Sequence, residues 1–282
     1  MTNRILVRIL SLLFVVNCVE KYENKQPLFK CNVDKFKISP KEHNLIIPST
    51  KNNKFKSFNE QTDFKKFNIY LDLNNFDYEI NKYNLTDKRE FYISGMNKAK
   101  ETLESLLEVR PVKNHRFYDE DLLRFGINRW DKNIIGNKTE KGMADLGIDL
   151  FIFIKFINST EFGDQTLAFS EAIYYGILNR QVVLGIARIN KDIDFKAKNS
   201  LRFFESVILH EFTHILGFDR NMFKNVYHNY YTKKDSYGIE RAYINSSKVI
   251  EVAKKYFNCP SIEGVELEDY GGDETVGSHW EE

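Results

Sequence analysis

Residues 199–217 contain the feature that most limits how this chain can fold. Asn199 or Ser200 can cap a helix at its start, and Gly217 can end that helix in a left-handed conformation. The helix is apolar nearly all round, at Phe203, Phe204, Val207, Ile208, Phe212, Ile215 and Leu216. A helix with no polar face has to be buried. The rest of the chain must therefore supply the apolar surface that covers it.

Three segments before this helix read as strands. Residues 67–73 alternate apolar and polar side chains, as a half-buried strand does. Residues 148–157 are almost all apolar, which is typical of a strand buried on both faces. Residues 181–190 form a further apolar strand, whose Gly185 and polar ending favour a place near the sheet edge.

Two further segments have helical periodicity. After Ser94, a plausible N-cap, one helical face gathers Met96, Ala99, Leu103, Leu106 and Leu107, and Pro111 stops this helix. A short amphipathic helix is expected near the chain end, with Val249, Val252, Ala253 and Phe257 on one face. The order of elements predicts a mixed layer of helices and strands, with the helix of residues 199–217 packed under a sheet.

The buried helix also carries the motif HEFTH. His210 and His214 are four residues apart and therefore lie on one face of the helix, where two imidazoles can reach one metal ion. Glu211 follows the first histidine and can act as a general base toward a water on that ion. A catalytic zinc keeps three protein ligands and one open position. The motif therefore predicts a hydrolytic zinc site that needs one more ligand.

The spacing alone leaves the third ligand open. In the compact pattern HExxHxxGxxH the third ligand comes three residues after the glycine, but here Arg220 occupies that position and cannot bind zinc. His228 lies in a Tyr-rich segment after Gly217, and His279 lies in the sequence GSHWEE at the end of the chain. Either histidine requires the chain to fold back toward the helix.

Taken together, HEFTHILGF, IEGVELEDYGG and GSHWEE resemble leishmanolysin, a family of surface zinc metallopeptidases within the metzincins. In that family a long segment separates the helix glycine from a third histidine in the GSHWE motif. The resemblance therefore implies that His210, His214 and His279 bind one zinc ion and that Glu211 is the base of a metalloendopeptidase acting on proteins. It runs from about residue 67 to residue 282 and is only textural before residue 145.

The same resemblance implies an α+β, metzincin-like catalytic domain with a mixed twisted sheet and a buried zinc-binding helix. Residues 66–217 would form its N-terminal catalytic subdomain, and residues 218–282 a partial central and C-terminal subdomain. An extended peptide substrate would add to the strand at residues 183–190 through main-chain hydrogen bonds. An ordinary covered strand is the competing interpretation of those residues.

The chain departs from the family pattern near its end. The family's Met-containing turn follows the third histidine, but here the last methionine is Met222 and the chain ends three residues after His279. Cysteines that the family carries around residues 168–182 are also missing. The sequence is therefore expected to be a fragment or a shortened paralogue. A catalytically inactive binding or adhesion module that keeps the fold is the alternative function.

The N-terminal residues predict export. Residues 1–18 combine two arginines with the apolar run at residues 9–16, as a secretory signal peptide does, and cleavage is expected near Cys18. An uncleaved membrane anchor is the alternative. Residues 19–65 are polar and read as a pro-segment, in which the resemblance implies that the Cys31 thiolate latches the zinc. A Cys31 paired with Cys259, or simply free, is the competing interpretation.

Composition and sequons fit an exported protein. With 41 basic and 40 acidic side chains, the chain gives no sign of a nucleic-acid partner. The predicted location is the outside of the cell, either secreted or at the membrane surface. Four N-x-S/T triplets are candidate glycosylation sites, and these are Asn84, Asn137, Asn158 and Asn245.

Overall fold

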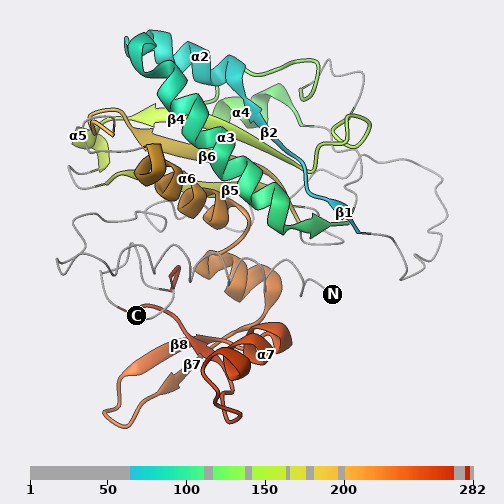
Figure 1. Ribbon diagram of the computed structural model, residues 1–282, viewed down its shortest axis with the longest axis vertical. Helices are drawn as coiled ribbons and strands as arrows, with labels where there is room; N and C mark the ends of the chain where they lie inside the picture. Colours follow the sequence, from blue (N-terminus) through green and yellow to red (C-terminus); the bar gives the residue numbers. More distant parts are fainter. Residues whose placement is uncertain are drawn as a thin grey trace.

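The computed structural model describes residues 64–110, 117–136, 142–162, 166–175, 181–195, 201–269 and 277–279 (Figure 1). The predicted signal peptide, nearly all of the pro-segment and Cys31 lie outside these residues, and so does Asn137. Within the described residues, no helix is both long enough and apolar enough to cross a bilayer.

A four-stranded mixed sheet organises the first part of the molecule. Its order is β2 (Ile69–Asp72), β4 (Leu150–Ile157), β6 (Val182–Asn190) and β5 (Ala168–Tyr175). The strands β2, β4 and β6 are parallel, and β5 runs antiparallel to β6. A separate two-stranded ribbon joins β1 (Lys65–Lys66) to β3 (Glu108–Val109). The mixture of helices with mixed sheets is compatible with the α+β class.

Strand β4 shows why its sequence is apolar at almost every position. Side chains alternate between the faces of a strand, and those of β4 enter two different hydrophobic clusters. Leu150, Ile152 and Ile154 belong to the larger cluster, whereas Phe151 and Phe153 belong to the smaller one. Both faces of this strand are therefore covered, as the sequence predicted.

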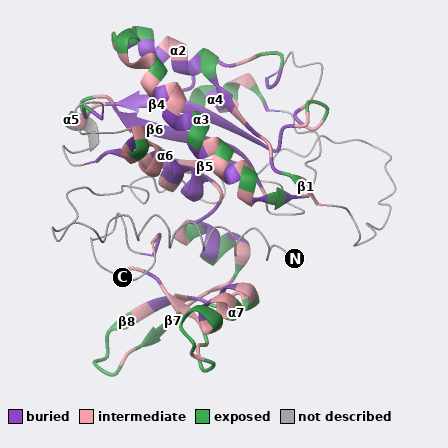
Figure 2. Ribbon diagram, in the orientation of Figure 1, coloured by how far each residue is buried: buried purple, intermediate pink, exposed green. Residues whose placement is uncertain are grey.

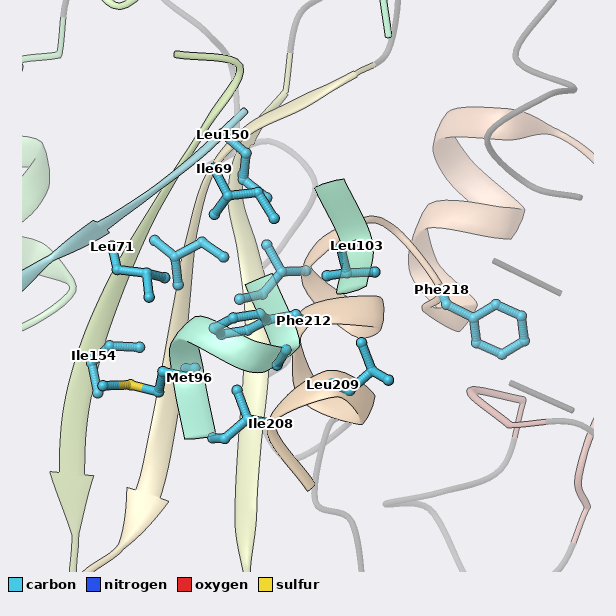
Figure 3. Close-up of a cluster of buried hydrophobic side chains, with 14 of the residues drawn as sticks. Ile69, Leu71, Met96, Leu103, Leu150, Ile154, Ile208, Leu209, Phe212 and Phe218 are labelled. Carbon is cyan, nitrogen blue, oxygen red and sulfur yellow. The ribbon is translucent and has the colours of Figure 1, made fainter. Parts of the chain in front are cut away.

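The larger cluster lies between the sheet and three helices. These helices are α2 (Leu73–Lys82), α3 (Arg89–Leu106) and α6 (Leu201–Ile215), and Figure 1 shows α3 and α6 crossing the sheet. Figure 3 shows side chains from β2, β4, α3 and α6 meeting in this cluster. The smaller cluster covers the opposite face with α4 (Asp119–Arg124) and the segments that follow it. The remaining short elements here are the 3₁₀ helix η2 (Thr86–Lys88) and α5 (Ser159–Phe162).

Two glycines allow α6 to lie close to both of its neighbours. A Cβ atom at Gly185 of β6 would come within 2.3 Å of Ile215, and one at Gly95 of α3 would come within 2.3 Å of Phe204. No real Cβ atom tolerates such a contact in a packed interior. The position of α6, and of the motif it carries, therefore depends on glycine, which has no side chain, at these two positions.

This packing corrects the prediction that placed residues 181–190 near the sheet edge. Strand β6 is an interior strand, every residue of it is buried, and its Gly185 makes room for Ile215. The two edge strands are β2 and β5, and the sequence did not reveal β5.

Helix α3 was also misplaced. It begins at Arg89, so Ser94 lies inside it, and it ends at Leu106 before β3 rather than beyond Arg110. Aromatic contacts outweigh the capping signal, because Tyr92 packs edge-on against Phe156 and Phe204.

A smaller region follows α6. It contains the π-helix η3 (Met222–Tyr227), the helix α7 (Ser247–Tyr256), and a three-stranded antiparallel sheet of β7 (Tyr230–Lys234), β8 (Glu240–Ile244) and β9 (Val265–Glu266). Val249 and Ala253 of α7 are buried as expected, but Phe257 caps the helix and is 53% exposed. Figure 2 shows many more exposed residues on this region than on the four-stranded sheet.

Candidate metal centre

Helix α6 brings His210 and His214 together. Residues four apart on an α-helix lie one turn apart on the same face, and here the two Nε2 atoms are 3.0 Å apart. His214 is buried and His210 is partly buried. The two imidazoles are therefore close enough to share one metal ion.

His279 reaches the same point from far along the chain. Its Nε2 atom lies 3.2 Å from Nε2 of His210, across a separation of 69 residues. One nitrogen of each histidine lies within 4.8 Å of the other two. Among the described residues, these three histidines form a group of side chains that could hold a metal ion.

The spacing of the three nitrogens suits a zinc ion. Zinc binds imidazole nitrogen at about 2.0–2.1 Å in tetrahedral geometry, so two ligand nitrogens on one ion lie about 3.3 Å apart. The two separations that involve His210, 3.0 and 3.2 Å, are close to that value, and the nitrogens of His214 and His279 lie within 4.8 Å of each other. Three histidines also leave one coordination position open, as catalytic zinc sites do.

The turn after α6 fixes the ring of His214. Nδ1 of His214 donates to the backbone oxygen of Phe218 at 2.7 Å, which leaves Nε2 as the acceptor that can bind a metal. Gly217 has φ +101° and turns the chain so that this carbonyl points back at the ring. A Cβ atom at Gly217 would lie 2.3 Å from the Tyr227 hydroxyl, so the position requires glycine twice over.

Two neighbours hold the segment that carries His279. On one side Nδ1 of His279 lies 2.8 Å from Oε2 of Glu268. On the other side the backbone N–H of Arg220 donates to the buried Ser278 hydroxyl at 3.4 Å. Arg220 occupies the position of a third ligand in the compact motif. Here its backbone contacts the segment that carries His279 instead.

Glu211 is buried between α6 and the edge strand β5. The Ser170 hydroxyl lies 2.6 Å from the backbone oxygen of Glu211 and 2.9 Å from its Oε2. Burial raises the pKa of the Glu211 carboxyl to about 8, although the hydrogen bond with Ser170 opposes that shift. Burial alone therefore favours the protonated form of this carboxyl at neutral pH, and a cation bound beside it would favour the ionised form.

The two helix histidines are shifted in the other direction. Burial lowers the pKa of His210 well below its usual value, and the nearby His214 and His279 lower it further. Burial and His279 also lower the pKa of His214, to about 3. Both rings are therefore neutral at physiological pH. Neutral imidazole is the form that binds metal ions.

Comparison with known proteins agrees with this geometry. The sequence profile described as leishmanolysin matches residues 85–282, which is most of the chain. The chain belongs to the leishmanolysin family. That family consists of zinc-dependent metallopeptidases. A leishmanolysin homolog from Crithidia fasciculata is 36% identical over 74 residues. That match covers 26% of this chain and 11% of the relative's length.

Other residues singled out in this leishmanolysin-family sequence lie elsewhere. His228 is exposed at the end of η3, with a left-handed backbone, and does not join the histidine cluster. Asn84 and Asn245 are exposed and Asn158 is partly exposed, so glycosylation at these three stays a prediction. Cys259 is partly exposed, with Sγ 3.3 Å from the Ser261 hydroxyl. A role for Cys31 as a latch or as its disulfide partner also stays a prediction.

Two polar residues of the leishmanolysin-family site were not found from sequence. Ser170 lies in a strand that was not predicted, so nothing linked it to Glu211. Glu268 belongs to the Gly- and acid-rich segment near the end of the given sequence. The only available signal was its place inside IEGVELEDYGG, one of the stretches that carry the family resemblance.

Proposed function

We propose that this chain is a zinc metalloendopeptidase that hydrolyses peptide bonds in proteins outside the cell. His210, His214 and His279 would hold one zinc ion per chain, and Glu211 would be the general base. The observation that carries the proposal is the convergence of three imidazole Nε2 atoms beside a buried carboxyl on the same helix.

The roles of the residues follow from their positions. Bound zinc supplies Lewis-acid chemistry, lowering the pKa of a bound water to about 7 and polarising a carbonyl oxygen. Glu211 would take the proton of the attacking water on its carboxylate and deliver it to the departing amine. Ser170 would keep the backbone and carboxyl of Glu211 in place, because its hydroxyl contacts both.

The edge strand offers a place for the substrate. Among the described residues β5 pairs with β6 alone, and its Ser170 contacts Glu211. An extended peptide can add to such an edge through main-chain hydrogen bonds. We therefore place the substrate along β5, next to the base, because residues 183–190 belong to the interior strand β6.

The location is inferred from the N-terminal residues. The apolar run at residues 9–16 and the candidate glycosylation sites support export, followed by release or attachment to the outer membrane surface. Surface labelling of cells that produce the full chain, compared with cells that produce a variant lacking residues 1–18, would test this part separately.

The enzymatic proposal is tested with Glu211→Gln. Glutamine is nearly isosteric but cannot accept the proton, so the variant should bind about one zinc ion per chain while cleaving casein at least about 100-fold more slowly, as loss of a general base predicts. Metal content by atomic absorption and casein cleavage, both measured before and after chelation, provide the readout. Glu205→Gln, which changes a helix residue outside the histidine cluster, is the matched control.

Two outcomes would count against the proposal. Equal casein cleavage by wild type and Glu211→Gln would rule out Glu211 as the base. A wild-type protein that holds zinc but cleaves no protein or peptide would favour the inactive binding or adhesion module.

A further inference from the structure

Glu268 makes three contacts with the segment that carries His279. The backbone N–H of Glu268 donates to the carbonyl of His279 at 2.9 Å, and the N–H of Gly277 donates to the carbonyl of Glu268 at 2.8 Å. These two bonds attach both ends of residues 277–279 to the backbone of Glu268. The Glu268 carboxylate adds a third contact, at 2.8 Å to Nδ1 of His279.

Glu268 is itself held from both sides. On one side Leu267 is fully buried, and its N–H donates to the carbonyl of Ala242 in β8 at 2.8 Å. On the other side Asp269 forms an ion pair with Arg241, which also lies 3.2 Å from Asp235. Glu268 is therefore a fixed point at the end of the three-stranded sheet.

The carboxylate contact has a chemical consequence for the histidine. A carboxylate can only accept, so Nδ1 of His279 carries the proton and Nε2 keeps its lone pair free. That lone pair faces His210 and the shared metal position. A carboxylate on the far nitrogen also makes an imidazole a stronger metal ligand.

We propose that Glu268 is a positioning residue that selects the tautomer and orients the ring of His279 for metal binding. The proposal rests on the three-histidine metal site of the proposed function, but does not require peptidase activity. The Phe218 carbonyl fixes the tautomer of His214 in the same way, but a backbone carbonyl cannot be removed by a side-chain substitution. Glu268 is thus the one of these two supports that mutagenesis can test directly.

An ordinary surface ion pair is the competing explanation. The two side chains are 16% and 28% exposed, and pairs near the surface usually contribute about 0–1 kcal/mol. Such a pair would help to tie residues 277–279 to the fold without affecting how tightly metal binds. The two explanations therefore differ in zinc affinity.

The experiment measures the zinc dissociation constant of the full chain by competition with a chromophoric chelator. Glu268→Ala should weaken zinc binding about 10–100-fold, the usual effect of removing such a partner. Glu268→Gln should stay within a few-fold of wild type, because its amide oxygen still accepts from Nδ1. Glu263→Ala, which removes an exposed carboxylate nearby, should leave the affinity unchanged.

A double-mutant cycle separates positioning from a structural role. Glu268→Ala should have no further effect on zinc affinity in a His279→Ala background, because the ring that it orients is absent. Melting curves of the metal-free variants check that the fold is retained. The proposal is overturned if Glu268→Ala binds zinc as tightly as wild type, or weakens binding equally with and without His279. Because zinc affinity is the readout, the result stands even if the protein hydrolyses no peptide.

Discussion

The two halves of the metal centre are built in different ways. His210 and His214 lie on α6, which is packed between β6 and α3 in the larger hydrophobic cluster. His279 lies on a short segment that hydrogen bonds attach to a much more exposed three-stranded sheet (Figure 2). Loss of a buried aromatic side chain costs about 3–5 kcal/mol, whereas one hydrogen bond contributes about 1 kcal/mol. Half of the site is therefore fixed by packing and half by weaker polar contacts.

The largest effect is expected from a cavity beneath the helix histidines. Phe212 is fully buried within the HEFTH motif, so Phe212→Ala should lower the free energy of unfolding by about 3–5 kcal/mol. Phe257→Ala, the matched change in the smaller region, should stay within about 0.5 kcal/mol because that ring is half exposed. Urea denaturation of both variants measures the difference, and similar losses in the two would erase the contrast between the regions.

A smaller effect is expected where α6 approaches β6. Gly185→Ala places a Cβ atom against Ile215, so it should cost about 1–3 kcal/mol and displace the helix that carries two ligands. Ile215→Ala removes the atoms that clash. The free energy of unfolding should therefore fall by less in the double variant than the sum of its decreases in the two single variants, as denaturation would show. Additive losses would mean that the close approach does not set the position of α6.

The smallest expected effect is a pH dependence far from the histidines. Asp72 accepts hydrogen bonds at the start of α2 and is fully buried, and burial raises its pKa from 3.8 to about 6. Between these two values the folded chain holds a proton that the unfolded chain releases. Wild-type stability should therefore fall as the pH rises from about 4 to about 6, by roughly 1–2 kcal/mol.

Asp72→Asn provides the comparison, because asparagine also caps helices but does not titrate. Denaturation at several pH values should show that the free energy of unfolding of the variant rises relative to that of wild type as the pH increases across that window. A difference between the two proteins that is flat with pH, or that reverses, would mean that the carboxyl is not protonated in the folded state. The packed region would then tolerate a buried charge better than its lack of solvent suggests.

Local pattern was sufficient for the parts of the structure that periodicity controls. The burial of β4 on both faces and the left-handed Gly217 were predicted correctly. The edge of the sheet was not, because strand order depends on pairings between distant segments that no local pattern records. Helix α3 was misplaced for a related reason, since the contacts of Tyr92 with α6 outweighed a local cap at Ser94.

The sequence by itself determined which residue types could form the centre: two imidazoles one helical turn apart, with a carboxylate between them. A single turn of helix has a fixed geometry, so their spacing needs no other information. The spacing in the sequence left the third ligand open between His228 and His279, and the family resemblance favoured His279. Only the tertiary structure brings His279 to the helix and reveals Glu268 and Ser170 beside the site. Those contacts join segments far apart in the chain, and their distances depend on how the two regions pack together.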